Sequence, residues 1–306
     1  MPYLLLLLLV SVMYMRVNGA NEGNSEWGYD AANGPDVWTG LCAKGQRQSP
    51  VDIRTENLQL IHTSDLLFVN YNATGKVQVQ NSGYSAAVTG FENWSERPSI
   101  SGGGLSDVYD LVQFHLHWAD KDNDGSEHQI GGLHYPLELH LVHLKRGLTF
   151  AAALEKADGL AVVGVLFAKA DNDTVLKPLE PALVASRFLS GNASVADFQA
   201  DSILPSSRNV FYRYEGSLTT PLCSEAVVWT VLAEPLFVSE NQLNVFRQFV
   251  DLHGHPMLSN RRPVMPLNER KVYLRLSGAG THLLPATYNV FVICLVALLG
   301  KEWIRE

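Results

Sequence analysis

The chain has 306 residues, of which 46% are hydrophobic and 18% are charged, and its formal net charge is −8 at pH 7. This length allows one large domain or two ordinary ones. The mildly acidic balance is typical of a soluble globular domain, and it lacks the basic excess of nucleic-acid-binding proteins, so we expect no nucleic-acid partner.

The N-terminal residues 1–20 predict a secretory signal peptide. Residues 4–10 form an unbroken apolar run, and the small residues Gly19 and Ala20 follow it, as in a leader with a cleavage site. The usual positive charge before the run is missing, so a buried N-terminal helix or strand is the alternative. Seven apolar residues in a row make a poor amphipathic element, which favours the signal peptide.

Export is consistent with the cysteines and with four sequons. Cys42 and Cys223 lie in the predicted folded part and could form one disulfide, with two separate buried thiols as the alternative. Four Asn-X-Ser/Thr sequons are candidate glycosylation sites: Asn72, Asn93, Asn172 and Asn192.

Residues 21–280 predict one domain, because no repeat or linker divides them. Polar and apolar residues alternate over 76–80, 111–117, 138–143 and 211–214, which predicts strands, and the apolar run 161–167 predicts a strand buried on both faces. Ser239 can cap a helix over residues 239–250. Many short strands and few helices predict an α+β, mostly β domain with one large, mainly antiparallel sheet and short peripheral helices.

The C-terminal residues 281–306 predict a hydrophobic membrane anchor. Residues 290–299 are continuously apolar, and small residues precede the segment at 277–280, as in a glycolipid-anchor signal. A short transmembrane helix and a buried core helix are the alternatives, and the charged end of the chain is unusual for an anchor signal. We expect the protein on the extracellular face of the plasma membrane, with a released, secreted form as a second location.

The most informative stretch is Gln-Phe-His-Leu-His-Trp at residues 113–118. Side chains alternate across a strand, so Gln113, His115 and His117 share one face. Two imidazoles on one face can hold a metal if a neighbouring strand supplies a third ligand. The alternative is a set of unrelated core and surface histidines that bind no metal.

Residues 138–143 supply a third candidate ligand. His140 lies on one face of the predicted strand with Glu138 and Val142, whereas His143 points the other way. Three neutral imidazoles with an open fourth position form a recognised catalytic zinc arrangement. Gln113 and Glu138 could accept hydrogen bonds from the outer nitrogens of such ligands. The spacing alone leaves both the metal site and the core histidines open.

These stretches resemble the alpha carbonic anhydrases. The resemblance covers nearly all of the body of the chain. It rests on residues 27–29, 46–53, 113–118, 126–128, 138–143, 216–221 and 260–263.

The resemblance implies a zinc enzyme that converts carbon dioxide reversibly to bicarbonate and a proton. It implies zinc (Zn2+) as the cofactor, bound by His115, His117 and His140. It further implies that these ligands are oriented by Gln113, Glu138 and the backbone carbonyl of Asn260.

Further roles follow from the same resemblance. Thr219 would accept a hydrogen bond from the zinc-bound hydroxide and pass one to Glu127, with Thr220 beside it at the substrate end. The implied carbon dioxide pocket consists of Val142, Val162, Leu218 and Trp229. The resemblance also implies a disulfide between Cys42 and Cys223, and a twisted sheet with zinc at the bottom of a cone.

Tyr84 departs from the pattern of the fast members of this family. It stands where those members carry a histidine that moves the proton to solvent. A histidine side chain has a pKa of about 6.5, whereas that of tyrosine is near 10. We therefore expect slow proton transfer, unless another group near the rim, such as His62 or the Tyr84 hydroxyl with water, takes the proton.

A catalytically weak or inactive extracellular binding or matrix module on the same fold is the alternative function. In that case the acidic stretch 120–124 could contact calcium. Its spacing does not fit a helix–loop–helix calcium site, and a solvated loop explains it more simply.

Overall fold

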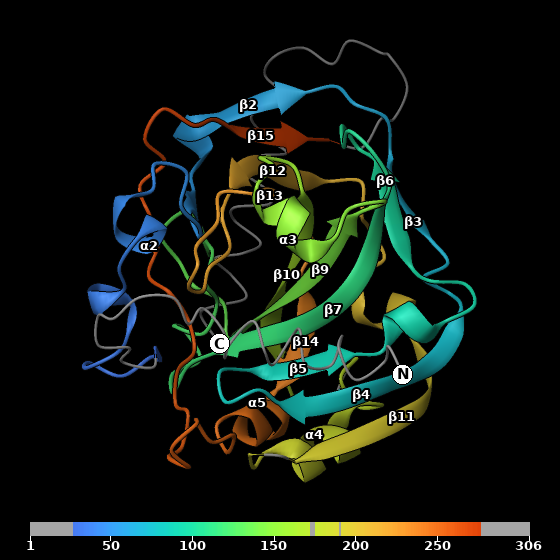
Figure 1. Cartoon of the computed structure of the whole chain (residues 1–306), viewed down its shortest axis with the longest axis vertical. Helices are drawn as coiled ribbons and strands as arrows, with labels where there is room; N and C mark the ends of the chain where they lie inside the picture. The colour runs from blue at the N-terminus through green and yellow to red at the C-terminus, as the bar shows by residue number, and fades with distance from the viewer. Residues whose placement is uncertain (1–26, 172–174, 190, 277–306) are drawn as a thin grey trace.

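One large sheet organises the molecule, as the computed structural model shows for residues 27–171, 175–189 and 191–276 (Figure 1). This sheet comprises β2 (Leu58–Ile61), β3 (Leu66–Val69), β4 (Thr74–Asn81), β5 (Ala86–Thr89), β6 (Ser99–Gly102), β7 (Tyr109–Trp118), β9 (Leu137–Lys145), β10 (Leu160–Ala170), β11 (Asn192–Gln199), β12 (Phe211–Gly216), β13 (Val227–Leu232), β14 (Leu236–Ser239) and β15 (Val272–Arg275). A small separate sheet pairs β1 (Asp52–Ile53) with β8 (Gln129–Ile130).

The large sheet runs in the order β11-β4-β5-β7-β9-β10-β13-β12-β15-β2, with β14 beside β10 and with β3 and β6 beside the end of β7. Most neighbours are antiparallel; β10 pairs parallel with β13 and β14, and β15 with β2. The predicted single, mostly β domain with a mainly antiparallel sheet is therefore confirmed.

The helices are short and pack outside the sheet (Figure 1). The α-helices are α2 (Leu41–Lys44), α3 (Phe150–Leu154), α4 (Glu180–Ser186) and α5 (Glu240–Phe246), and the 3-10 helices are η1 (Pro35–Val37), η2 (Thr55–Asn57), η3 (Phe91–Asn93) and η4 (Ala200–Ile203). Of these, α3 lies in front of the middle strands of the sheet, and α4 and α5 lie near β11 and β14.

The five predicted strand segments all lie in strands. They fall within β4, β7, β9, β10 and β12, and β10 is buried on both faces from Leu160 to Ala168, as its apolar run predicts. The predicted helix is confirmed at its start, where Ser239 caps α5 in a reciprocal pair with Gln242. It is shorter than predicted because Phe249 and Val250 bond to other segments, at Met257 and Arg187.

The two faces of the sheet carry different cores, and this difference places the candidate site. Leu139 and Leu141 of β9 pack into the larger hydrophobic cluster on one face. Val142 packs into a second cluster on the other face, together with residues of β10 and β13. Side chains alternate along a strand, so Glu138 and His140 belong to the Val142 face.

A disulfide joins Cys42 of α2 to Cys223, across 181 residues of sequence. This confirms the predicted bridge and ends the alternative of two free thiols. Both half-cystines are buried and pack against Trp38. Disulfides of this kind are typical of extracellular and secretory proteins.

Several sequence predictions concern residues outside the described part. The signal peptide at 1–20, the anchor at 281–306 and the sequon at Asn172 all lie there. Within the described part, no helix is long and apolar enough to cross a membrane. The sequon residues Asn72, Asn93 and Asn192 are exposed, so their glycosylation stays a prediction.

The acidic stretch 120–124 is engaged with cations of the protein itself. Asp122 bonds to Lys169 and to Arg247, the latter at 2.6 Å, and Asp124 bonds to Arg261. Two of the three carboxylates of this stretch, those of Asp122 and Asp124, are therefore paired with cationic side chains of the protein.

Candidate metal centre

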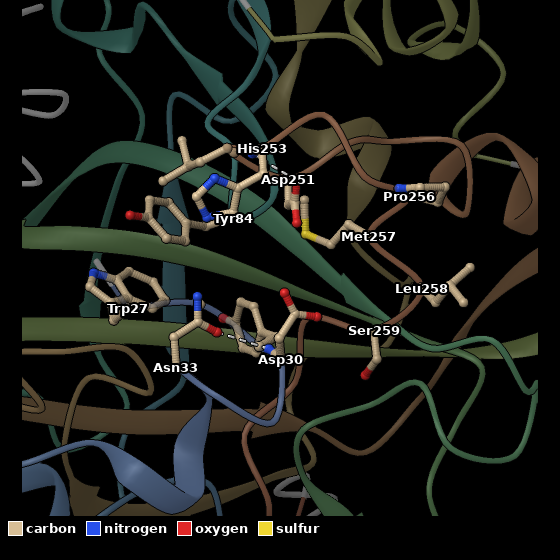
Figure 2. Close-up of a pocket in the computed structure, with 14 residues that line it drawn as sticks. Trp27, Asp30, Asn33, Tyr84, Asp251, His253, Pro256, Met257, Leu258 and Ser259 are labelled. Carbon is tan, nitrogen blue, oxygen red and sulfur yellow. Dashed lines mark hydrogen bonds between the residues drawn. The ribbon is translucent and has the colours of Figure 1, made fainter. Parts of the chain in front are cut away.

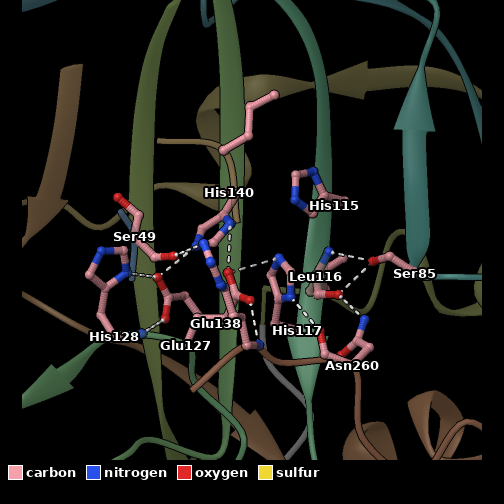
Figure 3. Close-up of polar contacts among 12 residues, drawn as sticks. Ser49, Ser85, His115, Leu116, His117, Glu127, His128, Glu138, His140 and Asn260 are labelled. Carbon is pink, nitrogen blue, oxygen red and sulfur yellow. Dashed lines mark hydrogen bonds and ion pairs between the residues drawn. The ribbon is translucent and has the colours of Figure 1, made fainter. Parts of the chain in front are cut away.

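Three histidines from two neighbouring strands come together on the Val142 face of the sheet (Figure 3). The antiparallel register of β7 and β9 sets His115 directly opposite His140, and His117 opposite Glu138. The ring centroids of the three imidazoles are 5.0, 5.3 and 4.6 Å apart. The structure thus brings together the three ligands that the sequence predicted.

One nitrogen of each ring is held from outside the cluster. His115 Nδ1 lies 3.0 Å from Gln113 Oε1, and His140 Nε2 lies 2.7 Å from Glu138 Oε1. His117 Nδ1 lies 2.8 Å from the backbone oxygen of Asn260. Each of these oxygens accepts a hydrogen bond from a ring N–H, so the other nitrogen of each neutral ring keeps its lone pair.

One ring nitrogen from each of the three histidines lies within 4.8 Å of the other two. His117 Nε2 is buried and has no hydrogen-bond partner, which is costly for a polar atom unless a metal or another group satisfies it. Burial and then the neighbouring imidazoles hold the pKa of His115 well below 6.5, and burial also lowers that of His117. Neutral, convergent imidazoles are the donor set of a metal site.

Asn260 ties the cluster of three histidines to β7, the strand that carries His115 and His117. Its side-chain oxygen accepts from the backbone N–H of Trp118 at 2.8 Å, and its Nδ2 donates to the backbone oxygens of Leu116 and Tyr84. Every polar group of this buried side chain is therefore engaged, and its backbone carbonyl is fixed against His117.

Glu138 lies at the centre of a buried network that sequence reasoning only partly found. Besides His140, its carboxylate accepts from the backbone N–H of His128 at 2.8 Å and from His128 Nδ1 at 2.6 Å. His128 Nε2 continues to the hydroxyl of Tyr214 at 2.7 Å, which reaches Ser49 at 3.0 Å. No spacing in the sequence signals that these three segments meet.

Burial alone would raise the pKa of Glu138, but its electrostatic interactions with the imidazoles of His128 and His140 and its hydrogen bonds with them outweigh burial and hold the pKa well below 4.5. His128, Glu138 and His140 also lie close enough to hold a metal. Both nitrogens of His128 and both oxygens of Glu138 are already bonded, so this group orients His140 rather than binding an ion itself.

Glu127 lies beside His117 and His140 and is fully buried. Its Oε1 accepts from the backbone N–H of Arg262 at 2.8 Å. Its Oε2 has no hydrogen-bond partner and lies 3.5 Å from His117 Nε2 and 3.8 Å from His140 Nδ1. The hydrogen bond from Thr219 that the family resemblance implies is therefore not formed here.

Thr219 and Thr220 lie in the loop between β12 and β13. Thr219 is buried and Thr220 is half-buried. The loop is held at one end by mutual hydrogen bonds between Ser49 and Ser217, at 2.9 and 3.0 Å. At the other end the disulfide anchors Cys223. Contacts from distant parts of the chain thus fix the position of both threonines.

The predicted apolar residues form a continuous wall beside the histidines. Register places Trp229 of β13 next to Val162 of β10, and Val162 next to Val142 of β9. All three are buried in one cluster, and Leu218 packs against it half-buried. The next row on this face is His140 and His115, so the wall borders the candidate metal site directly.

Tyr84 lies in the segment that follows β4, and its backbone oxygen accepts from Asn260 Nδ2 at 3.1 Å. Its ring stacks on Trp27 with centroids 3.9 Å apart and planes 14° from parallel (Figure 2). The side chain is largely buried, with 5% of its surface exposed. His62 follows β2 at the far edge of the sheet, so it is remote from Tyr84 in the strand order.

Comparisons with known proteins agree on one family. The family model of eukaryotic-type carbonic anhydrases matches residues 33–276. A relative named "Putative carbonic anhydrase 5", from Caenorhabditis elegans, is 42% identical over 309 residues, covering 98% of this chain and 99% of the relative. Human carbonic anhydrase 7 is 39% identical over 258 residues, covering 82% of this chain and 97% of the relative.

Proposed function

The chain belongs to the eukaryotic-type carbonic anhydrase family, and from this membership we propose that it catalyses the reversible hydration of carbon dioxide to bicarbonate and a proton. The observation that carries the proposal is the convergence of one free ring nitrogen from each of His115, His117 and His140. The substrate is a small molecule, and no nucleic-acid partner is proposed.

We propose zinc as the cofactor, held by these three nitrogens. Three neutral imidazoles leave one tetrahedral position for a reacting group, which is the pattern of catalytic rather than structural zinc. When bound, zinc lowers the pKa of a water molecule to about 7, a value for which carbonic anhydrases themselves are the standard example. Gln113, Glu138 and Asn260 keep the ligand nitrogens aimed inward.

Thr219 and Glu127 orient the attacking oxygen in this proposal. A carboxylate can only accept, so a hydrogen bond between the two residues would direct the Thr219 proton toward Glu127. Thr219 then offers only lone pairs to the attacking oxygen, which must donate to it. The unpartnered Oε2 of Glu127 supports this role, because that atom is available to accept.

The wall of Val142, Val162 and Trp229, with Leu218 at its border, is proposed to hold carbon dioxide. An uncharged linear molecule loses little on leaving water for an apolar surface. Thr220, half-buried beside Thr219, is proposed to face the polar product. The wall and the histidines occupy adjacent rows of one sheet face, so the substrate carbon can lie near the attacking oxygen.

We propose that the protein is exported and acts at the outer face of the plasma membrane, anchored through residues 281–306. The disulfide between Cys42 and Cys223 supports passage through an oxidising compartment. The exposure of Asn72, Asn93 and Asn192 is compatible with glycosylation there.

The proposed function is tested by replacing one ligand. His117→Ala in the full chain should abolish both bound zinc and carbon dioxide hydration, because a buried ligand is lost. His255→Ala, at an exposed histidine, is the matched control and should retain both. Hydration that persists in His117→Ala would overturn the assignment of the site.

A further inference from the structure

Three arginine side chains are buried in the described part of the chain, and one of them differs from the other two. Arg262 donates to three oxygen atoms of neighbouring segments. Arg275 donates to the carboxylate of Asp65 and to one backbone oxygen. Arg213 donates only through Nε, to the hydroxyl of Thr230 at 3.1 Å. Its Nη2 is buried and has no hydrogen-bond partner within the described residues.

The charge of Arg213 also lacks a counter-ion among the residues that the structure describes. Burial lowers the pKa of Arg213 from 12.5 to about 10, and the phenol of Tyr109, rather than a carboxylate, is what opposes this shift. A guanidinium with this pKa still carries its charge at neutral pH. A buried charge is costly unless hydrogen bonds and an opposite charge compensate it. The carboxylate of Asp65 does not serve this purpose, because it is paired with Arg275.

Arg213 lies on the face of the sheet opposite to the three histidines. Phe211 of the same strand belongs to the larger hydrophobic cluster, whereas Tyr212 belongs to the cluster of the Val142 face. Side chains alternate along a strand, so Arg213 shares the face of Phe211, and its guanidinium carbon lies 5.1 Å from the centre of that ring. A ligand at Arg213 is therefore separated from the proposed metal site by the sheet, in which β12 lies between β13 and β15 (Figure 1).

The turn that follows β6 approaches Arg213 without a side chain in between. Gly102, Gly103 and Gly104 have φ angles of 69°, 57° and 83°, which glycine adopts without strain. A Cβ atom on Gly104 would lie 3.7 Å from Arg213 Nη1 and 3.2 Å from the methyl carbon of Thr63, so a side chain would fill the space beside the guanidinium. Gly104 is exposed, and the path from solvent to the guanidinium therefore runs past it.

We propose that Arg213 and the glycine turn 102–104 form a binding site for one small inorganic oxyanion, such as bicarbonate, sulfate or phosphate. Nη1 and Nη2 make no hydrogen bond within the described residues, and two NH2 groups of one guanidinium match two oxygens of one oxyanion. The bound anion compensates the buried charge, so it stabilises the folded chain. The inference goes beyond the proposed function and does not depend on it.

The test is a sulfate titration of the zinc-loaded full chain at constant ionic strength, followed by NMR. The backbone amide resonances of Gly103 and Gly104 should shift and saturate, because the turn borders the anion. Chloride should shift them less, since it offers no pair of oxygens to the guanidinium. Phosphate and bicarbonate should also bind, and the oxyanion that saturates at the lowest concentration identifies the physiological source of the ligand. Resonances that no oxyanion moves, or that chloride moves equally, would overturn the inference.

Variants connect the binding to the guanidinium. Arg213→Gln should weaken sulfate binding at least tenfold, because it removes the charge and the paired NH2 groups. Arg213→Lys keeps the charge but not the paired groups and should bind severalfold more weakly; it carries the comparison if Arg213→Gln does not fold. Lys177→Met, at an exposed lysine before α4, removes the same charge elsewhere and should bind as the wild type does.

Unchanged sulfate binding in the Arg213 variants would overturn the site and would mean that water satisfies Nη2. An anion that binds at the proposed metal site would bind there in all of these proteins alike, because Arg213 lies on the other face of the sheet. Carbon dioxide hydration should be retained in Arg213→Lys. A wild type that binds sulfate at the glycine turn but does not hydrate carbon dioxide would overturn the proposed function and support this inference.

Discussion

Among single residues, Glu138 most directly fixes the orientation of His140, one of the three proposed metal ligands. Three N–H groups point at its buried carboxylate: two from His128 and one from His140. An amide in its place would offer one accepting oxygen and would turn an NH2 group toward a donor. The charge of Glu138 and the orientation of His140 are therefore coupled.

Glu138→Gln should weaken zinc binding by about 10- to 100-fold, the usual cost of losing a residue that orients a metal ligand. Competition with a chelating dye measures the affinity. Glu215→Gln, at an exposed carboxylate, should leave it unchanged. Equal affinity in Glu138→Gln and the wild type would show that His140 needs no carboxylate behind it.

A histidine in place of Tyr84 should give the proton released during hydration a nearer acceptor. Tyr84→His should raise kcat for hydration in dilute buffer, because an imidazole exchanges protons near neutral pH and a phenol does not. Tyr84→Phe removes only the hydroxyl and should leave kcat near that of the wild type. No gain in Tyr84→His, together with no response of the wild type to imidazole, would mean that proton transfer does not limit turnover.

His143 gives the clearest pH dependence of stability. It is fully buried between the hydroxyl of Tyr71, 2.5 Å from Nε2, and the backbone oxygen of Ala161, 3.1 Å from Nδ1. Burial lowers the pKa of His143 from 6.5 to about 3. Below pH 6.5 His143 therefore binds a proton in the unfolded chain but not in the folded chain. The free energy of unfolding falls for this reason as the pH drops from 6.5 toward 3.

This single group should contribute about 1.4 kcal/mol of lost stability per pH unit in that window. His143→Gln, unfolded with urea in the presence of a chelator, should show a correspondingly shallower dependence, whatever its stability at pH 7. His62→Gln, at an exposed histidine, should keep the wild-type slope. Identical slopes in all three proteins would contradict a neutral buried His143.

At the scale of elements, the disulfide joins α2 to the loop that carries Thr219. It closes a segment of 181 residues. Arg262 reinforces this junction, because its guanidinium donates to the backbone oxygens of Cys42 and Ser49 while its backbone N–H holds Glu127. The bridge thus supports the same region that positions the two proposed orienting residues.

Cys42→Ala/Cys223→Ala should lose about 5 kcal/mol of unfolding free energy, the chain-entropy estimate for a loop of this length. Chemical denaturation measures the loss, and the wild type with a reducing agent should approach the same value. A midpoint that is unchanged in the double variant would mean that the loop is held by its hydrogen bonds alone.

The elements themselves were largely predictable, since alternation in β4, β7, β9 and β12 reports directly which side chains share a face. The C-terminal end of α5 was not predictable from the sequence. Phe249 and Val250 are apolar at helical spacing, yet their backbone groups form hydrogen bonds with Met257 and Arg187. Those partners belong to other segments, and periodicity carries no information about them.

At the scale of the whole molecule, the candidate site depends on long-range register. Alternation predicts that His115 and His117 share a face, but only the pairing of β7 with β9 sets His140 opposite His115. The pattern at 138–143 offered His140 as a third candidate ligand, and the family resemblance assigned it that role and added Asn260. The resemblance did not single out His128, Tyr214 or Ser49, which meet behind Glu138 from three separate parts of the chain.

The two faces of the sheet differ in role: one stabilises the fold and the other carries the candidate site. One face of the sheet holds the larger apolar core, while the other holds the histidines and the apolar wall on adjacent rows. Rigid strands therefore carry both the proposed metal and the proposed substrate surface. Side chains on strands are held more precisely than side chains on loops. Thr219 and Thr220 lie on a loop, but the disulfide and the hydrogen bonds of Ser49 hold that loop in place.

The measurement that tests the central claim most directly is carbon dioxide hydration by the metal-free full chain as zinc is added back. The account predicts stopped-flow activity that rises with zinc and saturates at one equivalent per chain, with no activity in His117→Ala at any zinc level. Tight binding of one zinc without hydration would contradict it, and would favour a non-catalytic extracellular module on the same fold.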